Sequence, residues 1–177
     1  MKTFILGAAV ALLFGFGPAA AYDNEFLYAE DPYGGACPIG AHVRRANPRD
    51  ALENTGRPFR PMNEHRVLRR GRPYGPPLDG PETTDERGLL FLCLNADIER
   101  QFEFIQQNWI NNSTFGGLAE ESDPLVGVCS AHGGVFTMGS LPARQRVDHL
   151  PRFVTVKGGQ YFFLPGIAAL RSLAEPL

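Results

Sequence analysis

The feature that most constrains the fold is an uninterrupted apolar run that leads directly into a helical pattern. Residues 88–94 read GLLFLCL, and such a run between polar flanks predicts a strand buried on both faces. Ile98, Phe102, Ile105 and Trp109 follow at helical spacing and predict one apolar helix face. A strand and a helix that both need burial predict a layered domain.

The boundaries of this first helix follow from polar residues at both ends. Asn95 is the predicted N-cap, and Asp97 and Glu99 place negative charge near the positive end of the helix dipole. Residues 111–113 (NNS) are expected to end it.

The last third of the chain predicts short strands and a second helix. Residues 135–138, 153–157 and 161–164 are strand-like, and Gly-Gly at 158–159 favours a tight hairpin turn between the last two. Pro165 suits the start of a final helix carrying Ile167, Leu170 and Leu173. This order of strands and helices along the chain predicts an α+β fold with helices on one face of a mainly antiparallel sheet.

Residues 42–87 are rich in arginine and proline and show little periodicity. They are therefore expected to be irregular, and a segment of that length inside a compact domain is usually functional or disordered.

The N-terminus predicts a signal peptide over residues 1–21. Lys2 precedes an apolar run from Phe4 to Phe16, and alanines at 19–21 supply the small residues of a cleavage site. A short membrane anchor or a buried helix is the alternative, although the run is short and glycine-rich for a span. Residues 22–177 would then form the mature domain, exported to the periplasm or the extracellular space, with no membrane segment.

Charge and cysteine content exclude some classes and leave others open. The net charge of −2 argues against a nucleic-acid partner. The sequence contains no nucleophile elbow, phosphate loop or zinc-finger spacing. Cys37, Cys93 and Cys129 are an odd number for an exported chain, and a Cys37–Cys129 disulfide is possible but follows from no spacing rule.

His42 is the best candidate for a metal ligand. It lies just before Arg44, Arg45 and Arg49, and guanidinium groups suit the carboxylates of a porphyrin. From the residues alone, a surface histidine is the simpler interpretation. Residues 65–75 form a second arginine-dense segment, which is either a solvated loop or an anion-binding loop.

Four collinear segments together resemble the dye-decolourising (DyP-type) peroxidase family over about residues 26–173. They are CPIGAHVRRANPR at 37–49, LRRGRPYG at 68–75, DERGLLFLCLNADIERQFEFIQQ at 85–107 and LPRFVTVKGGQYFFLP at 150–165. The resemblance implies a ferredoxin-like antiparallel sheet with helices on one face, which is the C-terminal half of a two-domain dimeric α+β barrel. It also implies haem b (iron protoporphyrin IX) as cofactor, with hydrogen peroxide and an aromatic donor such as a dye as substrates.

The resemblance assigns roles to individual positions. His42 matches the proximal iron ligand, and Asp123 matches the acid that hydrogen-bonds it. Arg69 matches the distal arginine, and Leu89 and Phe91 match the apolar pair of the distal pocket. The candidates for contacts with the haem propionates are Arg44 and Arg49.

These residue types suit peroxide chemistry. A cationic arginine stabilises the charge that develops as the O–O bond breaks. An aspartate that accepts a hydrogen bond from the proximal histidine makes the imidazole a stronger donor to iron.

The chain departs from the family pattern in one respect. The family's distal acid–base aspartate lies in a Gly-x-x-Asp-Gly motif of the N-terminal half, and this sequence contains no such motif. Three explanations stay open: an inert fragment, a small exported haem protein with weak or no turnover, and a split enzyme whose other half lies on another chain. A half-domain on its own would expose apolar surface, so we expect it to form an oligomer, bind a partner domain or be poorly stable.

Two functions follow. The first is an oxidoreductase, a haem peroxidase of the DyP type. The second is a catalytically impaired haem-binding half-domain that needs a partner chain.

Overall fold

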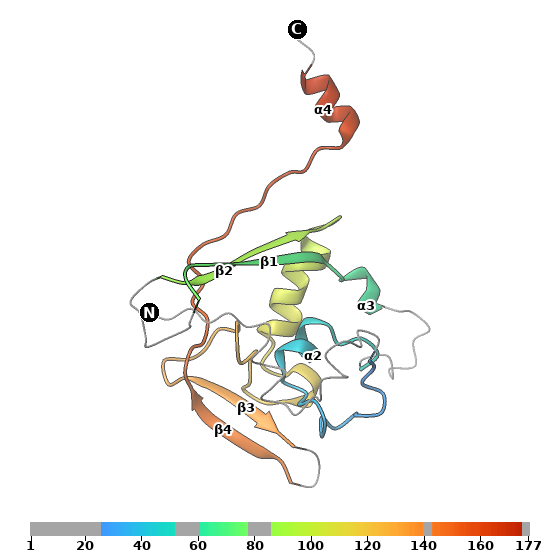
Figure 1. Ribbon diagram of the computed structural model, residues 1–177. Coiled ribbons are helices and arrows are strands. Elements are labelled where there is room, and N and C mark those ends of the chain that lie inside the picture. Colours follow the sequence, from blue (N-terminus) through green and yellow to red (C-terminus); the bar gives the residue numbers. More distant parts are fainter. Residues whose placement is uncertain (1–25, 52–60, 78–85, 140–142, 175–177) are drawn as a thin grey trace.

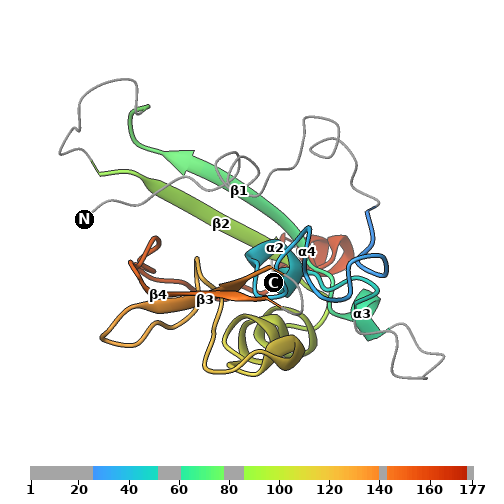
Figure 2. The ribbon, with the colours of Figure 1, turned by 90° about the horizontal axis from the view of Figure 1, so that it is seen from below.

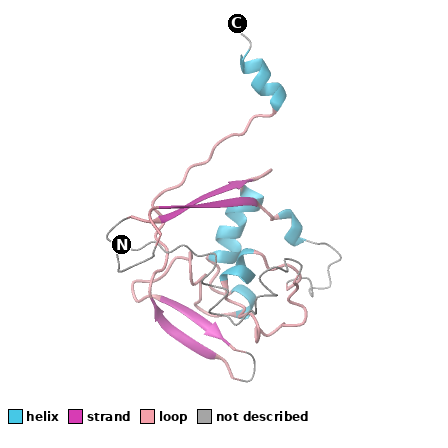
Figure 3. Ribbon diagram, in the orientation of Figure 1, coloured by secondary structure: helices cyan, strands magenta, loops and turns pink. Residues whose placement is uncertain are grey.

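The computed structural model describes residues 26–51, 61–77, 86–139 and 143–174. They form two separate two-stranded antiparallel sheets with helices between and beside them (Figure 3). This mixture of helices and antiparallel strands confirms the predicted α+β class. The predicted signal peptide lies outside the described residues.

The first sheet pairs β1 (Leu68–Tyr74) with β2 (Gly88–Leu94). The strand predicted at 88–94 is therefore confirmed. The expectation that residues 42–87 are irregular was wrong for β1, which has no apolar alternation of its own. Its strand conformation depends on the backbone ladder with β2, which pairs Leu68 with Leu94 and Tyr74 with Gly88.

The prediction that β2 is buried on both faces was also wrong. Leu90 and Leu92 are 63% and 59% exposed, and on the other face Leu89 and Phe91 are 44% and 49% exposed. In a two-stranded sheet each strand pairs with only one neighbour, and one helix lies against this sheet (Figure 1). The apolar run thus lacks the second layer that its composition calls for.

The helix after β2 consists of η2 (Glu99–Glu103) and η3 (Ile105–Ile110) and is wound as a π-helix. Hydrogen bonds that span five residues join the Glu103 N–H to the Ile98 carbonyl and the Asn111 N–H to the Gln106 carbonyl. The predicted end at residues 111–113 is confirmed. The predicted cap at Asn95 is not, because the Asp97 carboxylate accepts the bond from the Arg100 N–H at 3.0 Å.

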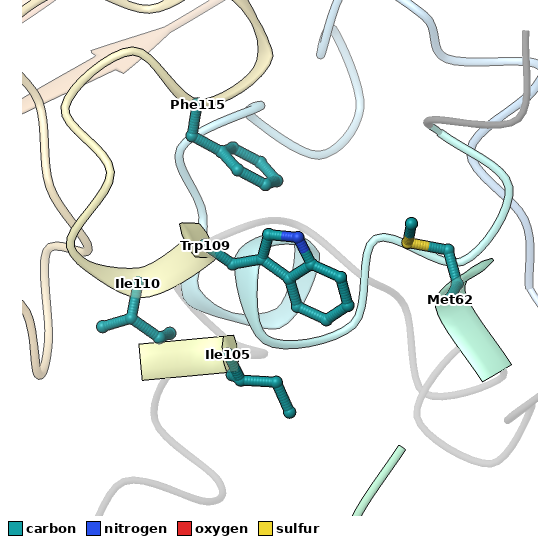
Figure 4. Packing of buried hydrophobic residues seen from close by; sticks show 5 residues of the cluster. All are labelled: Met62, Ile105, Trp109, Ile110 and Phe115. Atoms are coloured by element: carbon teal, nitrogen blue, oxygen red, sulfur yellow. The ribbon is translucent and has the colours of Figure 1, made fainter. Parts of the chain in front are cut away.

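The larger core cluster forms around the end of this helix (Figure 4). Ile105, Trp109 and Ile110 are buried there with Met62 of α3 (Pro61–Glu64) and with Phe115 of η4 (Phe115–Gly117). Burial of Ile105 and Ile110, five residues apart, fits the wider π-helical turn. The predicted apolar face is thus confirmed at Ile105 and Trp109.

A second core cluster lies under the other sheet, which pairs β3 (Gly134–Met138) with β4 (Gln145–Leu150). It contains Tyr28, Cys37, Ala41 and Phe136. The short strand predicted at 135–138 is thereby confirmed. α2 (His42–Ala46) lies between the two hairpins in both ribbon views (Figures 1 and 2).

The C-terminal segment leaves the body of the molecule. Residues 151–166 are extended and contain no strand, so the hairpin predicted at 153–157 and 161–164 was wrong. The segment then enters α4 (Ile167–Ala174), the predicted final helix (Figure 1). Strands need backbone partners, and a Cβ added at Gly158 or Gly159, at the expected turn, would meet no atom within 4 Å outside its chain neighbours. Among the described residues, no helix is long and apolar enough to cross a membrane.

This segment generates a testable expectation about association. Phe162 and Phe163 are 83% and 88% exposed, which is unfavourable for a chain that stays alone in water. We expect the mature chain to self-associate at micromolar concentration, and the double substitution F162S/F163S to reduce this association. Sedimentation velocity over a concentration series measures it, and R152S on the same segment is the polar control. A monodisperse wild-type monomer would contradict the expectation.

Candidate active site

α2, which lies between the two hairpins, carries His42 (Figure 1). The helix starts after Ala41, whose backbone is extended, and the Ala41 carbonyl accepts hydrogen bonds from the N–H groups of Arg44 and Arg45. Asn47 is followed by Pro48, and a residue before proline disfavours the helical conformation, so the helix ends after one turn. His42 is the first residue of this turn, and its side chain is 35% exposed.

The His42 ring is held by a buried carboxylate. Nδ1 of His42 lies 2.8 Å from Oδ2 of Asp123, and the Asp123 side chain is fully buried. An ionised carboxylate only accepts hydrogen bonds, so Nδ1 carries the proton and donates it. The other ring nitrogen, Nε2, keeps its lone pair and is the one that can coordinate a metal.

The Asp123 carboxylate is fixed from its other side by a turn. Its Oδ1 accepts hydrogen bonds from the N–H groups of Leu125 and Val126, each at 2.9 Å. Its carbonyl accepts from the N–H of Gly127, and its own N–H donates to the Ile110 carbonyl at 2.8 Å. The Asp-Pro pair at 123–124 is a common way to start such a turn, and the side chain caps it. The acceptor of the His42 bond is therefore rigidly placed.

The predicted distal residues lie together on one face of the β1–β2 hairpin. Arg69 is paired with Cys93, Phe91 with Gly71, and Leu89 with Pro73. Residues opposite each other in an antiparallel pair share a face, so Arg69, Leu89 and Phe91 project from the same side. Within the described residues, no hydrogen bond joins this face to His42 or Asp123.

Arg44 has a structural role in the fold, and its predicted contact with a propionate stays a prediction. Its guanidinium is buried and donates to Oδ2 of Asp31 at 3.2 Å and to the carbonyls of Asp31 and Cys37 at 2.9 Å each. It also stacks on the Tyr28 ring, 4.5 Å from the centroid. The guanidinium therefore fixes the backbone of the 28–37 segment through these hydrogen bonds.

Arg49 lies at the surface end of the same region. Its guanidinium lies 4.1 Å from the centroid of the Phe26 ring, and its backbone φ is 53°, in the left-handed region. Arg49 and Arg66 line one pocket of about 300 Å³. Contact of Arg49 with a propionate stays a prediction.

Two buried charged residues near the site were missed by sequence reasoning. Arg45 and Glu121 are both fully buried. The spacing contained a signal for Arg45, because it lies three residues after His42 and therefore on the same helix face. The sequence does not show that Arg45 is buried, because burial of an arginine depends on hydrogen-bond acceptors that come from distant segments.

The Glu121 carboxyl lies near Thr137 and Arg45, but neither of its oxygens has a hydrogen-bond partner of regular geometry. Burial raises the pKa of Glu121 above its ordinary value, although Thr137 and Arg45 oppose this shift. Burial lowers the pKa of the Arg45 guanidinium, and the nearby Glu121 and Asp123 carboxyl groups oppose this shift.

Comparison with known proteins identifies the fold. Residues 27–141 match the family model described as "Dyp-type peroxidase, C-terminal". The chain belongs to the DyP-type peroxidase family. It is 36% identical over 166 residues to the multifunctional dye peroxidase DyP2 of Amycolatopsis sp. (strain ATCC 39116 / 75iv2), covering 85% of this chain and 35% of that protein. It is 33% identical over 178 residues to the dye-decolorizing peroxidase msp1 of Mycetinis scorodonius, covering 88% and 34%.

The solved structures of DyP-type peroxidases share the architecture. The structure of DyP2 from Amycolatopsis sp. ATCC 39116 matches with a TM-score of 0.71 at 33% identity, over 88% of this chain and 36% of that one. A triple mutant of the enzyme from Auricularia auricula-judae matches with a TM-score of 0.71 at 30% identity, over 87% and 39%. The α+β prediction is confirmed, and the chain spans about a third of the length of these relatives.

The raised pKa of Glu121 predicts how stability depends on pH. Above the ordinary pKa of 4.5, the unfolded chain loses this proton while the folded chain keeps it. The folded state then binds more protons, so its stability falls as pH rises. In E121Q this loss is absent, and we expect its free energy of unfolding to increase relative to that of the wild type as pH rises above 4.5.

Urea denaturation across this pH range measures the difference. E120Q is the matched control because the Glu120 side chain is 88% exposed. Parallel pH profiles for wild type and E121Q would show that Glu121 titrates normally.

Proposed function

We propose that this chain is the haem-binding, proximal half of a peroxidase of the DyP type, which uses hydrogen peroxide to oxidise dyes and other aromatic donors. The observation that carries the proposal is the 2.8 Å bond from Nδ1 of His42 to the buried Asp123 carboxylate. A carboxylate–histidine pair of this kind orients a metal-ligating imidazole and raises its basicity.

The residues present fit haem b. Nδ1 of His42 is hydrogen-bonded to Asp123, the ring is partly exposed, and Nε2 would be the atom that holds the iron. Arg49, the predicted propionate contact, would supply a guanidinium that suits a carboxylate. When bound, haem supplies the iron redox chemistry by which peroxide is reduced and the donor oxidised.

The hairpin face supplies the residues that suit the peroxide side. Arg69 would stabilise negative charge as the O–O bond breaks. Leu89 and Phe91 lie on the same face and would exclude water. A solved relative is described as a complex with 2,6-dimethoxyphenol, which supports an aromatic donor for this chain as well.

One element of the proposed reaction is an acid–base group near the peroxide. Proton transfer between the two peroxide oxygens needs an acid–base group, and the sequence contains no Gly-x-x-Asp-Gly segment to supply it. We propose that a partner polypeptide, equivalent to the remaining two thirds of the relatives, provides this group and covers the exposed apolar surface. That surface includes Leu90, Leu92, Phe162, Phe163, Ile167 and Leu173. The apolar run at 4–16 supports export of the chain, so we propose that the chain and its partner meet outside the cytoplasm.

The alternative is a binding protein that holds haem without turnover. The missing acid–base group favours it for the chain alone. Haem uptake is common to both functions, whereas turnover separates them.

Haem uptake tests the proximal assignment. We expect the wild-type chain to show a Soret band after haem addition and H42A to lose it, because His42 would hold the iron. H132A is the matched control, since His132 is exposed and lies in a turn. Absorbance titration gives the affinity. A wild-type chain without a Soret band would exclude both functions, and equal loss in H132A would remove the assignment of His42.

Turnover tests the distal assignment. With a partner polypeptide added, we expect R69L to lower peroxide-dependent dye oxidation on the order of 100-fold, because a transition-state charge loses its cation. R70L is the control, since Arg70 is the next residue of β1 and projects from the opposite face. Equal effects of R69L and R70L would contradict the role of Arg69. Haem binding with no turnover under any partner condition would favour the binding protein.

A further inference from the structure

A single buried guanidinium connects three separate parts of the chain. Arg45 is fully buried, and its Nε donates to the Gly40 carbonyl at 3.2 Å. Its Nη1 donates to the carbonyls of Trp109 and Asn112, each at 2.9 Å, and its Nη2 donates to the Glu121 carbonyl at 2.6 Å. All four acceptors are backbone groups, so this arginine holds the path of the chain.

The Trp109 carbonyl belongs to the last turn of η3, and the Asn112 carbonyl lies two residues beyond its end. The last carbonyls of a helix have no partner within the helix, and positive charge is favourable at that end. Trp109 lies at this end of the helix in Figure 4, next to Ile110. Arg45 therefore caps η3 from α2, and this explains why a buried cation is tolerated here.

The same helix end also holds Asp123, whose N–H donates to the Ile110 carbonyl at 2.8 Å. The contacts form a closed ring. Arg45 connects α2 to the end of η3 and to Glu121, and Asp123 connects the end of η3 to His42, which lies on α2 again. The position of Asp123 relative to His42 thus depends on the same three segments that Arg45 joins.

We propose that Arg45 is a positioning residue for the His42–Asp123 pair. Its planar fork of five N–H donors satisfies carbonyls in several directions at once, whereas a lysine ammonium is a point charge with three donors. The interpretation of the His42–Asp123 pair as a proximal iron site rests on the proposed function. The positioning of the pair by Arg45 is a property of the chain without haem.

The Nδ1 proton of His42 reports on the pair directly. In the full-length, haem-free chain labelled with ¹⁵N-histidine, its NMR signal is identified by its loss in H42A. We expect R45K to lose this signal or to raise the exchange rate of the proton with water on the order of tenfold, which corresponds to loss of about one hydrogen bond.

R44K is the matched control. Arg44 is the neighbouring residue of α2 and is also buried, but its guanidinium holds Asp31 and Cys37 instead. We expect R44K to keep the Nδ1 signal of His42. A folded R45K chain with an unchanged signal would overturn the proposal, and so would equal loss in R44K and R45K.

A second variant covers the case in which R45K does not fold. Replacing both members of a buried polar pair by apolar residues is better tolerated than leaving one of them without its partner. In the double substitution R45M/E121M the fork is absent, and the buried Glu121 carboxyl beside it is removed as well. A folded double variant with a weakened Nδ1 signal supports the proposal, and one with the wild-type signal overturns it. Failure of both variants to fold would make Arg45 a general structural residue and would also overturn it.

These outcomes are separate from those of the proposed function. A wild-type chain that binds no haem can still show the Nδ1 signal and its loss in R45K. Conversely, haem uptake can be lost in H42A while the Nδ1 signal of His42 is unchanged in R45K. That result supports the proposed function and excludes the positioning role of Arg45.

Discussion

The buried carboxylate of Asp123 is the constraint on which the rest of the structure depends. A carboxylate without exposure needs hydrogen bonds, because its desolvation is otherwise costly. It obtains them from His42 and from the N–H groups of Leu125 and Val126. These donors stand in place only when α2, the turn after Asp123 and the end of η3 are packed together. The candidate site is therefore built from the same contacts as the core, and the chemistry of His42 cannot be separated from the packing around Trp109.

The two sides of the molecule differ in how complete they are. The side that contains His42 also contains Asp123, Arg45 and Glu121, all buried, and a core of large side chains. The hairpin side presents Arg69, Leu89 and Phe91 on an exposed sheet face, and the C-terminal segment extends from the body (Figure 1). Exposed apolar area on this scale is typical of an interface. The difference agrees with a chain that spans about a third of the length of its relatives.

Sequence reasoning worked where the signal is local or where long segments are collinear with a known family. The strand at 88–94, the helix that ends at 111–113 and the final helix at 167–174 follow from short-range patterns. It was wrong at β1, because a strand with no alternation of its own is held only by its partner. It was wrong at 153–164, because the Gly-Gly turn needs two strands that pair. Arg44 was preferred over Arg45 as a site residue, since nothing in the order of two adjacent arginines shows which acceptors each will meet.

By itself, the sequence determined the α+β class, the family, and the pairing of His42 with Asp123 as an expectation carried by resemblance. Only the tertiary structure decided that the bond between them is made, that Arg44 holds the 28–37 segment, and that Arg45 joins α2 to the end of η3. The physical reason is that residue type and spacing set which groups can donate and accept. Which donor meets which acceptor across 64 to 81 residues depends on the packing of segments that no local pattern encodes.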